Sequence, residues 1–392
     1  MSAITAKASR IMKKYAVLTR EPRCFLGSFD FSWEQRKVSD LAEKTYGGGT
    51  PTTSNEAYWN GDIPWIQSSD VVDGKLLGVE PRKWITQDGL NNSAAQLIPG
   101  NSIAIITRVG VGKLAFMPYS YATSQDFLSL SKLNAEPLFT VYACYKKLQS
   151  ELNAVQGTSI KGITKDELLA KNIMVPRYAE QQQIGAFFKQ LDNLITLHQR
   201  KCANLCSPSQ VVFSLLFATS TFSWEQRKAK EICSIGTGKS NTQDQVDDGK
   251  YPFYIRSDVP VRSNKYLYDC EAVITIGDGN IGKVFHYVNG KFDLHQRCYK
   301  MTDFKDIWGK YFFYYFSTKF YDRAMKMTAK ATVDSVRLEM ISEMDIKKPP
   351  QISEQKQIAE FFANLDNLIT LHQRELEKLQ NIKKSMLEKM FV

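Results

Sequence analysis

Two lysines that follow glycine turns are the residues whose types and spacing first suggest chemistry in this chain of 392 residues. Lys113 closes the segment RVGVGK, and Lys283 closes the segment GDGNIGK. A glycine turn offers backbone amides and the lysine adds a cation, so each turn could bind phosphate or another anion. The simpler alternative is a β-hairpin turn with incidental surface charge. Because the pattern occurs twice, we favour a binding role for both turns.

Three segments resemble chemical motifs but fail on their spacing. The segment IGTGKS, residues 235–240, resembles the end of an ATP-binding loop, yet Cys233 stands where that motif needs its first glycine. The segment RVGVGK lacks the third glycine of a dinucleotide site. The segment KKPPQ, residues 347–351, lacks the flanking residues of an adenine methyltransferase motif. We therefore predict no cofactor and no catalytic residues.

The net charge indicates which class of partner the protein binds, and the cysteine pattern indicates its cellular compartment. The formal net charge of +10 and the pI near 9.0 favour a polyanionic partner such as nucleic acid. The seven cysteines lack the paired spacing of a zinc site or a disulfide framework. Cys202 and Cys206 share a helical spacing but have no second ligand pair. We predict reduced thiols, no bound metal and a cytoplasmic location.

The chain contains no segment with the pattern of a membrane span or a secretory signal. Its central apolar run, Val211–Ala218, is too short for a bilayer. The first twenty residues carry basic side chains, among them Arg10, Lys13, Lys14 and Arg20, and no acidic one, but they lack the apolar stretch of a signal peptide. We predict an N-terminal arm over residues 1–20 and no membrane partner.

Two blocks of sequence occur twice. LDNLITLHQR begins at Leu191 and at Leu365, and FSWEQRK begins at Phe31 and at Phe222. The regions between these blocks differ in length and in amino-acid sequence. Duplication explains this layout, which indicates a common frame that carries two different binding regions.

The longer repeated block is predicted to form helices, because its apolar residues recur in steps of four and three. We expect two antiparallel helices packed along these seams, 184–205 against 358–379, with an internal pseudo-twofold axis. The seam residues that we assign to the helix interface are Ile184, Phe188, Leu191, Ile195, Ile358, Phe362, Leu365 and Ile369. His198 and His372 continue the two seams, where a polar layer that sets the register is favoured over a metal site. Pro208 should kink or end the first helix.

The regions between the repeated blocks predict an α/β (α+β) fold. Residues 63–71 have the pattern of a strand. Residues 101–116 and 271–287 each show two β runs that are joined by a glycine turn. The segments SQDF, residues 124–127, and HQRCY, residues 295–299, follow at similar distances. We therefore expect one fold in both halves, with Trp33 and Trp224 of the repeated heptapeptide as packing anchors rather than base-stacking platforms.

These motifs together resemble the specificity subunit of a type I restriction–modification enzyme. The resemblance covers residues 21–392 and includes GGGTP, YWNGDIPWIQSSDV, SIKGITKDELLAKNIMVP and EQQQIGAFFKQLDNLI. It implies two similar target-recognition domains, joined by two long antiparallel coiled-coil helices, that each read half of a split DNA sequence. It also implies double-stranded DNA, two methyltransferase subunits and restriction (translocase) subunits as partners. Two stretches depart from the family pattern: the start before Trp33 and the junction between the halves.

The resemblance places the domain boundaries as follows: target-recognition domains at 21–176 and 222–350, and conserved helices at 177–217 and 351–392. We predict that DNA is contacted by side chains on and beside the glycine turns, because Arg, Asn and Gln pair with base edges and Lys binds phosphate. These residues are Arg108, Lys113, Gln125, Asn280, Lys283, Gln296 and Arg297. One alternative is a coiled-coil scaffold that links two modules without DNA binding. Another is a self-contained methyltransferase, which the missing motifs disfavour.

Overall fold

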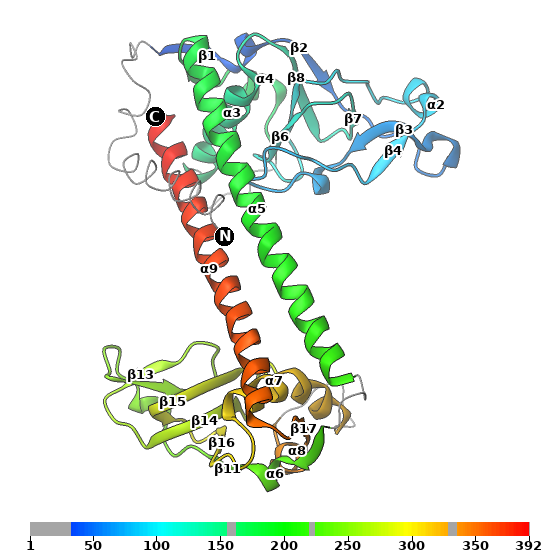
Figure 1. Ribbon diagram of the computed structural model, residues 1–392. Coiled ribbons are helices and arrows are strands. Elements are labelled where there is room, and N and C mark those ends of the chain that lie inside the picture. Colours follow the sequence, from blue (N-terminus) through cyan, green and yellow to red (C-terminus); the bar gives the residue numbers. More distant parts are fainter. Residues whose placement is uncertain (1–32, 155–161, 219–223, 328–334, 392) are drawn as a thin grey trace. The chain divides into compact units, whose positions relative to one another are not determined.

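The computed structural model in Figure 1 describes residues 33–154, 162–218, 224–327 and 335–391. The predicted N-terminal arm, residues 1–20, lies outside the described residues. Contacts divide the chain into two compact units: unit 1 comprises residues 1–199 and 374–392, and unit 2 comprises residues 200–373. Each unit has hydrophobic cores of its own. Among the described residues, no helix is long and apolar enough to cross a membrane.

Unit 1 combines small sheets with helices. Its elements before the first long helix are β1 (Glu34–Lys37), β2 (Ala42–Gly47), β3 (Trp59–Ile66), β4 (Lys83–Ile85), α2 (Gln87–Asn91), β5 (Ser102–Ile106), β6 (Leu114–Met117), β7 (Ala122–Thr123), β8 (Phe127–Leu133), α3 (Pro137–Ala154), α4 (Lys165–Leu169) and β9 (Asn172–Val175). Hydrogen bonds order the strands as β2-β8-β5-β6, β4-β3-β7 and β1-β9.

The strand β5 of unit 1 is apolar after Ser102, because both of its faces are buried. Ile103 and Ile105 belong to the core that includes α3, whereas Ala104 and Ile106 belong to a second core on the other face. β5 pairs antiparallel with β6, with Ser102 opposite Met117. The predicted pair of β runs around this glycine turn is therefore confirmed.

Unit 2 combines a larger sheet with helices. Its elements are β10 (Glu225–Lys228), α6 (Ala229–Ile232), β11 (Ser234–Thr237), β12 (Tyr251–Tyr254), β13 (Val261–Ser263), β14 (Tyr268–Ile276), β15 (Phe285–Leu294), β16 (Cys298–Thr302), α7 (Gly309–Lys326), α8 (Leu338–Ser342) and β17 (Asp345–Lys348). The six-stranded sheet has the order β11-β16-β14-β15-β12-β13, and β10 pairs with β17. β14 and β15 form the predicted hairpin, with Thr275 opposite Phe285.

Aromatic side chains of α7 form much of the core of unit 2. Phe312, Phe316 and Phe320 recur every four residues on one face of the helix and are fully buried. Their rings stack with centroid separations of 5.5 Å and 4.6 Å. α7 packs on β14 and β15 through this face.

Two long helices follow the variable regions: α5 (Tyr178–Ala218) and α9 (Ile352–Met390), shown in green and in orange to red in Figure 1. Their bounds lie within two residues of the predicted helices, 177–217 and 351–392. We predicted that Pro208 would kink or end the first helix, but α5 continues past Pro208 to Ala218. A proline removes one backbone hydrogen bond, and the many others of a 41-residue helix outweigh that loss.

The predicted pairing of the seams is corrected in unit 1. The first seam lies against α3 and the last part of α9, around Leu379 and Met386, rather than against 358–379 as a whole. Two polar contacts fix this register: Lys383 Nζ lies 2.6 Å from Asp192 Oδ1, and His198 Nδ1 lies 3.3 Å from Glu375 Oε2. The apolar spacing of α9 continues past Leu379, so periodicity alone allows more than one register.

The predicted strand at 63–71 is shorter than expected. β3 ends at Ile66, and residues Ser68–Asp70 form a 3-10 turn. The Asp70 carboxylate accepts a hydrogen bond from the Gln67 amide at 3.0 Å, which stabilises the turn.

Candidate nucleic-acid interface

The repeated heptapeptide and the repeated helix are joined by the same hydrogen bond in both units. Trp33 Nε1 donates to Glu180 Oε1 at 3.2 Å in unit 1, and Trp224 Nε1 donates to Glu354 Oε1 at 3.3 Å in unit 2. The residues after these tryptophans form β1 and β10, which pair with the strands that precede the long helices. The role of both tryptophans as packing anchors is confirmed, and each ties the start of a variable region to its end.

A tyrosine of each variable region also binds the repeated helix. The Tyr142 hydroxyl donates to Asp192 Oδ2 at 2.6 Å, and the Tyr314 hydroxyl donates to Asp366 Oδ2 at 2.7 Å. Burial and the neighbouring carboxylate raise the pKa of Tyr142, which keeps its hydroxyl protonated as a donor. These paired contacts define a duplicated frame, onto which both units attach their variable turns.

The glycine turn of unit 1 joins β5 to β6. Gly110 and Gly112 both have φ of +91°, a conformation that favours glycine. A Cβ on Gly112 would lie 2.2 Å from a side-chain carbon of Leu152. Arg108 at the start of this turn is exposed, and Lys113 at its end is half-buried.

The glycine turn of unit 2 joins β14 to β15. Gly279 and Gly282 have φ of +83° and +68°, and a Cβ on Gly282 would lie 2.9 Å from the backbone of Tyr321. Lys283 Nζ lies 5.9 Å from the centre of the Tyr321 ring. Asn280 and Lys283 are both exposed. Both predicted turns therefore present polar side chains to solvent on backbone that requires glycine.

A second turn in each unit carries an exposed glutamine. Gln125 Oε1 accepts a hydrogen bond from Thr50 Oγ1 at 2.6 Å. Gln296 Nε2 donates to Asn241 Oδ1 at 2.6 Å. Thr50 and Asn241, the partners of the two glutamines, each lie shortly after a glycine that packs closely against backbone. A Cβ on Gly48 would lie 1.8 Å from the Ser124 carbonyl oxygen, and a Cβ on Gly238 would lie 2.2 Å from the Leu294 carbonyl oxygen. The glycine-rich stretch near residue 48 thus allows close approach rather than phosphate binding.

Two arginines of unit 2 converge on one carboxylate. Arg256 Nη1 lies 3.1 Å and Arg297 Nη1 lies 2.9 Å from Asp278 Oδ2. The arginine side chains are 44% and 61% exposed, whereas that of Asp278 is 20% exposed. Burial opposes ionisation of Asp278, but the hydrogen bonds from Arg297 and Arg256 outweigh it and lower the pKa of this carboxyl. The result is a pair of positioned guanidinium groups on an ionised support.

Backbone hydrogen bonds identify the equivalent positions in unit 1. The Gly277 amide donates to the Arg297 carbonyl at 2.8 Å, as the Thr107 amide does to the Asp126 carbonyl. Asp278 and Arg297 of unit 2 therefore correspond to Arg108 and Asp126, so the two charges are exchanged.

The third position follows from the parallel strand pairs. Tyr254 lies opposite Leu294 in β12 and β15, and Ile66 lies opposite Thr123 in β3 and β7. Two residues beyond Tyr254 is Arg256, and two residues beyond Ile66 is Ser68. One shared framework therefore carries different side chains at three matched positions.

Comparison with known protein families identifies the family to which this duplicated frame belongs. Residues 32–205 and 223–381 match the type I restriction modification DNA specificity domain. The chain belongs to this family. The two matches are two copies of the specificity domain, of which the first lies largely in unit 1 and the second largely in unit 2.

Several specificity subunits are similar to the chain. It is 28% identical over 191 residues to the type I restriction enzyme MjaIX specificity subunit of Methanocaldococcus jannaschii, a match that covers 47% of this chain and 43% of that protein. It is 29% identical over 214 residues to the EcoR124I/EcoR124II specificity subunit of Escherichia coli, covering 49% and 52%. The chain thus matches about half the length of these two relatives. A match to the MjaVIII specificity subunit of M. jannaschii is 27% identical over 404 residues and covers 91% of both proteins.

Solved structures share the fold. The S subunit of a type I restriction–modification system from M. genitalium aligns with a TM-score of 0.63 and 17% identity, over 93% of this chain and 98% of that one. A chain from a study of complex assembly and conformational transition of the type I system aligns with a TM-score of 0.54 and 15% identity, over 91% and 97%. At these identities the similarity shows the fold alone.

Within this specificity-family fold, the predicted contact residues of each unit lie on neighbouring turns, which in unit 1 are joined by the hydrogen bond from the Thr107 amide to the Asp126 carbonyl. In unit 2, Gln296 and Arg297 meet the glycine turn through the contact of Arg297 with Asp278. In unit 1, Arg108 and Lys113 lie on one turn, and Gln125 lies on the turn that precedes β8.

Sequence reasoning missed two residues of this surface. Arg256 and Asn241 lie far along the chain from Arg297 but contact the same cluster. One signal was available for Arg256: residues 251–258 read YPFYIRSD, which parallels IPWIQSSD at residues 63–70.

The helix residues assigned to an interface have different environments in the two specificity domains. Ile184, Phe188, Leu191 and Ile195 are all buried in the core of unit 1. In unit 2, Phe362 is buried against Tyr314, with ring centroids 5.6 Å apart. The remaining residues of the second seam are half-buried: Ile358, Leu365 and Ile369.

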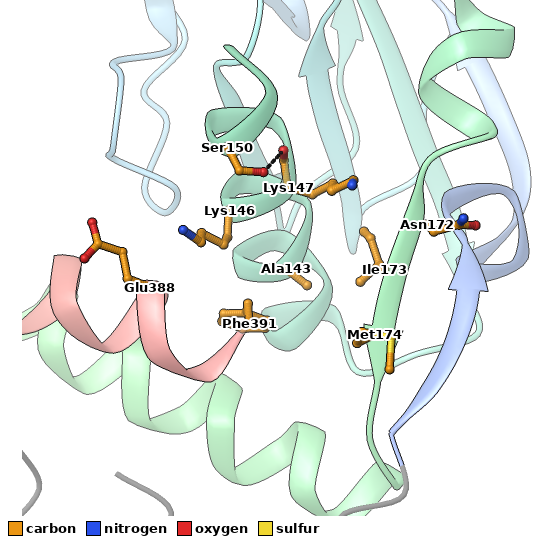
Figure 2. A pocket seen from close by; sticks show the side chains of 9 residues that line it. All are labelled: Ala143, Lys146, Lys147, Ser150, Asn172, Ile173, Met174, Glu388 and Phe391. Carbon is orange, nitrogen blue, oxygen red and sulfur yellow. Dashed lines mark hydrogen bonds between the residues drawn. The ribbon is translucent and has the colours of Figure 1, made fainter. Parts of the chain in front are cut away.

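A cavity of about 450 Å³ lies in unit 1 between α3, β9 and the end of α9 (Figure 2). Figure 2 shows Lys146, Lys147 and Glu388 at its edge, and Phe391 at the base of α3. The rest of the lining is Ala143, Ser150, Asn172, Ile173 and Met174. This lining includes neither a glycine loop nor a nucleophile–base pair, so the cavity gives no support to the methyltransferase alternative.

Proposed function

We propose that the chain is the sequence-specific DNA-binding subunit of a type I restriction–modification complex. Its target-recognition domains, 21–176 and 222–350, each read one half of a split double-stranded DNA target. The helical segments, 177–217 and 351–392, set the spacing between the halves. One observation carries the proposal: Gln125 and Gln296 occupy the same exposed turn in both domains, among side chains that differ. A duplicated frame with exchanged polar side chains suits a protein that reads two different sequences.

The proposal includes partners that supply the chemistry. The chain holds two methyltransferase subunits and the restriction (translocase) subunits on the DNA and is itself non-catalytic. Support comes from the failed catalytic motifs and from the names of the three relatives given above, which are specificity subunits. The net charge of +10 suits a polyanionic partner. We also propose a cytoplasmic location, because the proposed partner is DNA.

Sequencing of methylated bases in the genome tests this function. We expect a host that carries the chain to methylate one split motif, and a host that lacks it to lose that methylation. Unchanged methylation would reject the proposed function. A duplex-DNA binding assay separates it from the alternative of a coiled-coil scaffold, because a scaffold for other modules would bind no duplex with sequence preference.

A further inference from the structure

The arginine pair of unit 2 has hydrogen-bond donors left over. Arg256 and Arg297 each use Nη1 to contact Asp278. Within the described ranges, the structure gives no partner to Nε or Nη2 of either guanidinium. Two adjacent N–H groups of one guanidinium form the fork that pairs with O6 and N7 of guanine. Each arginine therefore keeps a complete fork while its other edge is held.

The central carboxylate favours base reading over phosphate contact. It cancels one of the two positive charges, which weakens the attraction of the cluster to any DNA regardless of sequence. It also restricts two long side chains, so less rotamer freedom is lost when they bind. A phosphate contact needs charge but no fixed fork, whereas bidentate pairing with a base needs the fixed fork.

We propose that Arg256, Asp278 and Arg297 form a guanine-specific reading site in the second target-recognition domain. Arg297, the more exposed arginine, pairs with guanine, and Asp278 acts as a positioning residue for both arginines. This inference rests on the proposed function and adds the base that the site recognises.

The equivalent positions of the first domain extend the inference. Ser68, Arg108 and Asp126 replace the arginine–aspartate–arginine set. The Asp126 carboxylate, which accepts a hydrogen bond from Ser124 Oγ at 3.3 Å, stands where the second domain has its exposed guanidinium. A carboxylate accepts from the amino group of cytosine and repels guanine O6 and N7. The two domains therefore differ in base preference at the matched position.

Selection of DNA from a randomised duplex library by the full chain tests the site. The selected duplexes then serve in titrations with wild type, Arg297→Lys and Asp278→Asn. Arg297→Lys keeps the charge but loses the fork. We expect it to reduce the preference for guanine at one position of the second half-site by about tenfold, with the salt dependence of binding unchanged. Asp278→Asn should reduce the preference at the same position.

Arg227→Lys is the matched control, because Arg227 is an exposed arginine of the same unit and pairs with Glu225 at 3.8 Å on β10. It should leave the preference unchanged. If wild type selects no motif, both the proposed function and this inference fail. If wild type selects a motif and both test variants keep the full guanine preference, the inference alone is overturned. An equal loss for all duplexes in Arg297→Lys would also overturn it, because that result marks a phosphate contact.

Discussion

Under the proposed function, the side chains on the glycine turns would make two kinds of DNA contact. Lysine carries a compact, strongly hydrated charge that suits phosphate, whereas arginine and glutamine can pair with base edges. We therefore expect Lys113→Ala and Lys283→Ala to weaken binding to all duplexes about equally. Each variant should lower the slope of log affinity against log salt by ~0.9, since one phosphate contact is lost.

Fluorescence anisotropy over a salt series measures this effect. Lys378→Ala on α9 is a suitable control, because Lys378 is exposed but lies on the repeated helix rather than on a variable turn. A lysine variant that changes the order of preference among duplexes would show that its turn reads bases instead.

The sequence allowed the turns to be predicted because their signals are local. Glycine, lysine and strand patterns stand next to each other at residues 108–113 and 277–283. The contact of Arg256 with Asp278 has no local signal. Parallel pairing of β12 with β15 places Arg256 near the end of β15, and the Gly277 amide bonds to the Arg297 carbonyl just beyond that end. Which residues that are distant in the sequence come into contact depends on the order of strands in the sheet, and periodicity does not specify that order.

At the scale of elements, the burial of the first seam makes α5 a structural part of the first domain. Leu191 is fully buried, whereas Leu197 of the same helix is 41% exposed. We expect Leu191→Asp to lower the free energy of unfolding by about 3 kcal/mol or more, because an unpaired carboxylate would be buried. Leu197→Asp should change it by about 0.5 kcal/mol or less.

Urea unfolding of the full chain, followed by circular dichroism, compares the two variants. Equal stability of Leu191→Asp and wild type would contradict the packing of this seam. Equal losses in both variants would show a general effect of charge on α5 rather than burial at one position.

The helices show how far periodicity alone can go. Steps of four and three residues were enough to predict helices over 184–205 and 358–379, and the family resemblance extended them to bounds close to those of α5 and α9. The partner of each seam was not predictable in the same way, since a regular seam repeats itself along the helix. Specific polar pairs such as Asp192 with Lys383 select the register, and these look like ordinary surface charges in the sequence.

At the scale of the whole molecule, the Trp–Glu anchor pairs are alike in the two halves, whereas the variable regions between them differ. The contacts of Trp33 with Glu180 and of Trp224 with Glu354 are the same bond in two copies. Each closes a variable region at its base, so the frame need not change when the region between its ends does. Duplication therefore explains why the anchor pairs are alike while the side chains between them differ.

Exchange of one reader tests this modularity. Residues 222–350 would be replaced by the second target-recognition domain of a related specificity subunit, with Trp224 and Glu354 kept as the anchor pair. We expect genome methylation to change in one half of the split motif only. The other half should persist because residues 21–176 are unchanged, and the spacer should persist because the helical segments are unchanged. The reciprocal exchange of residues 21–176 is the matched control and should change only the opposite half. A change in both halves after either exchange would contradict independent reading.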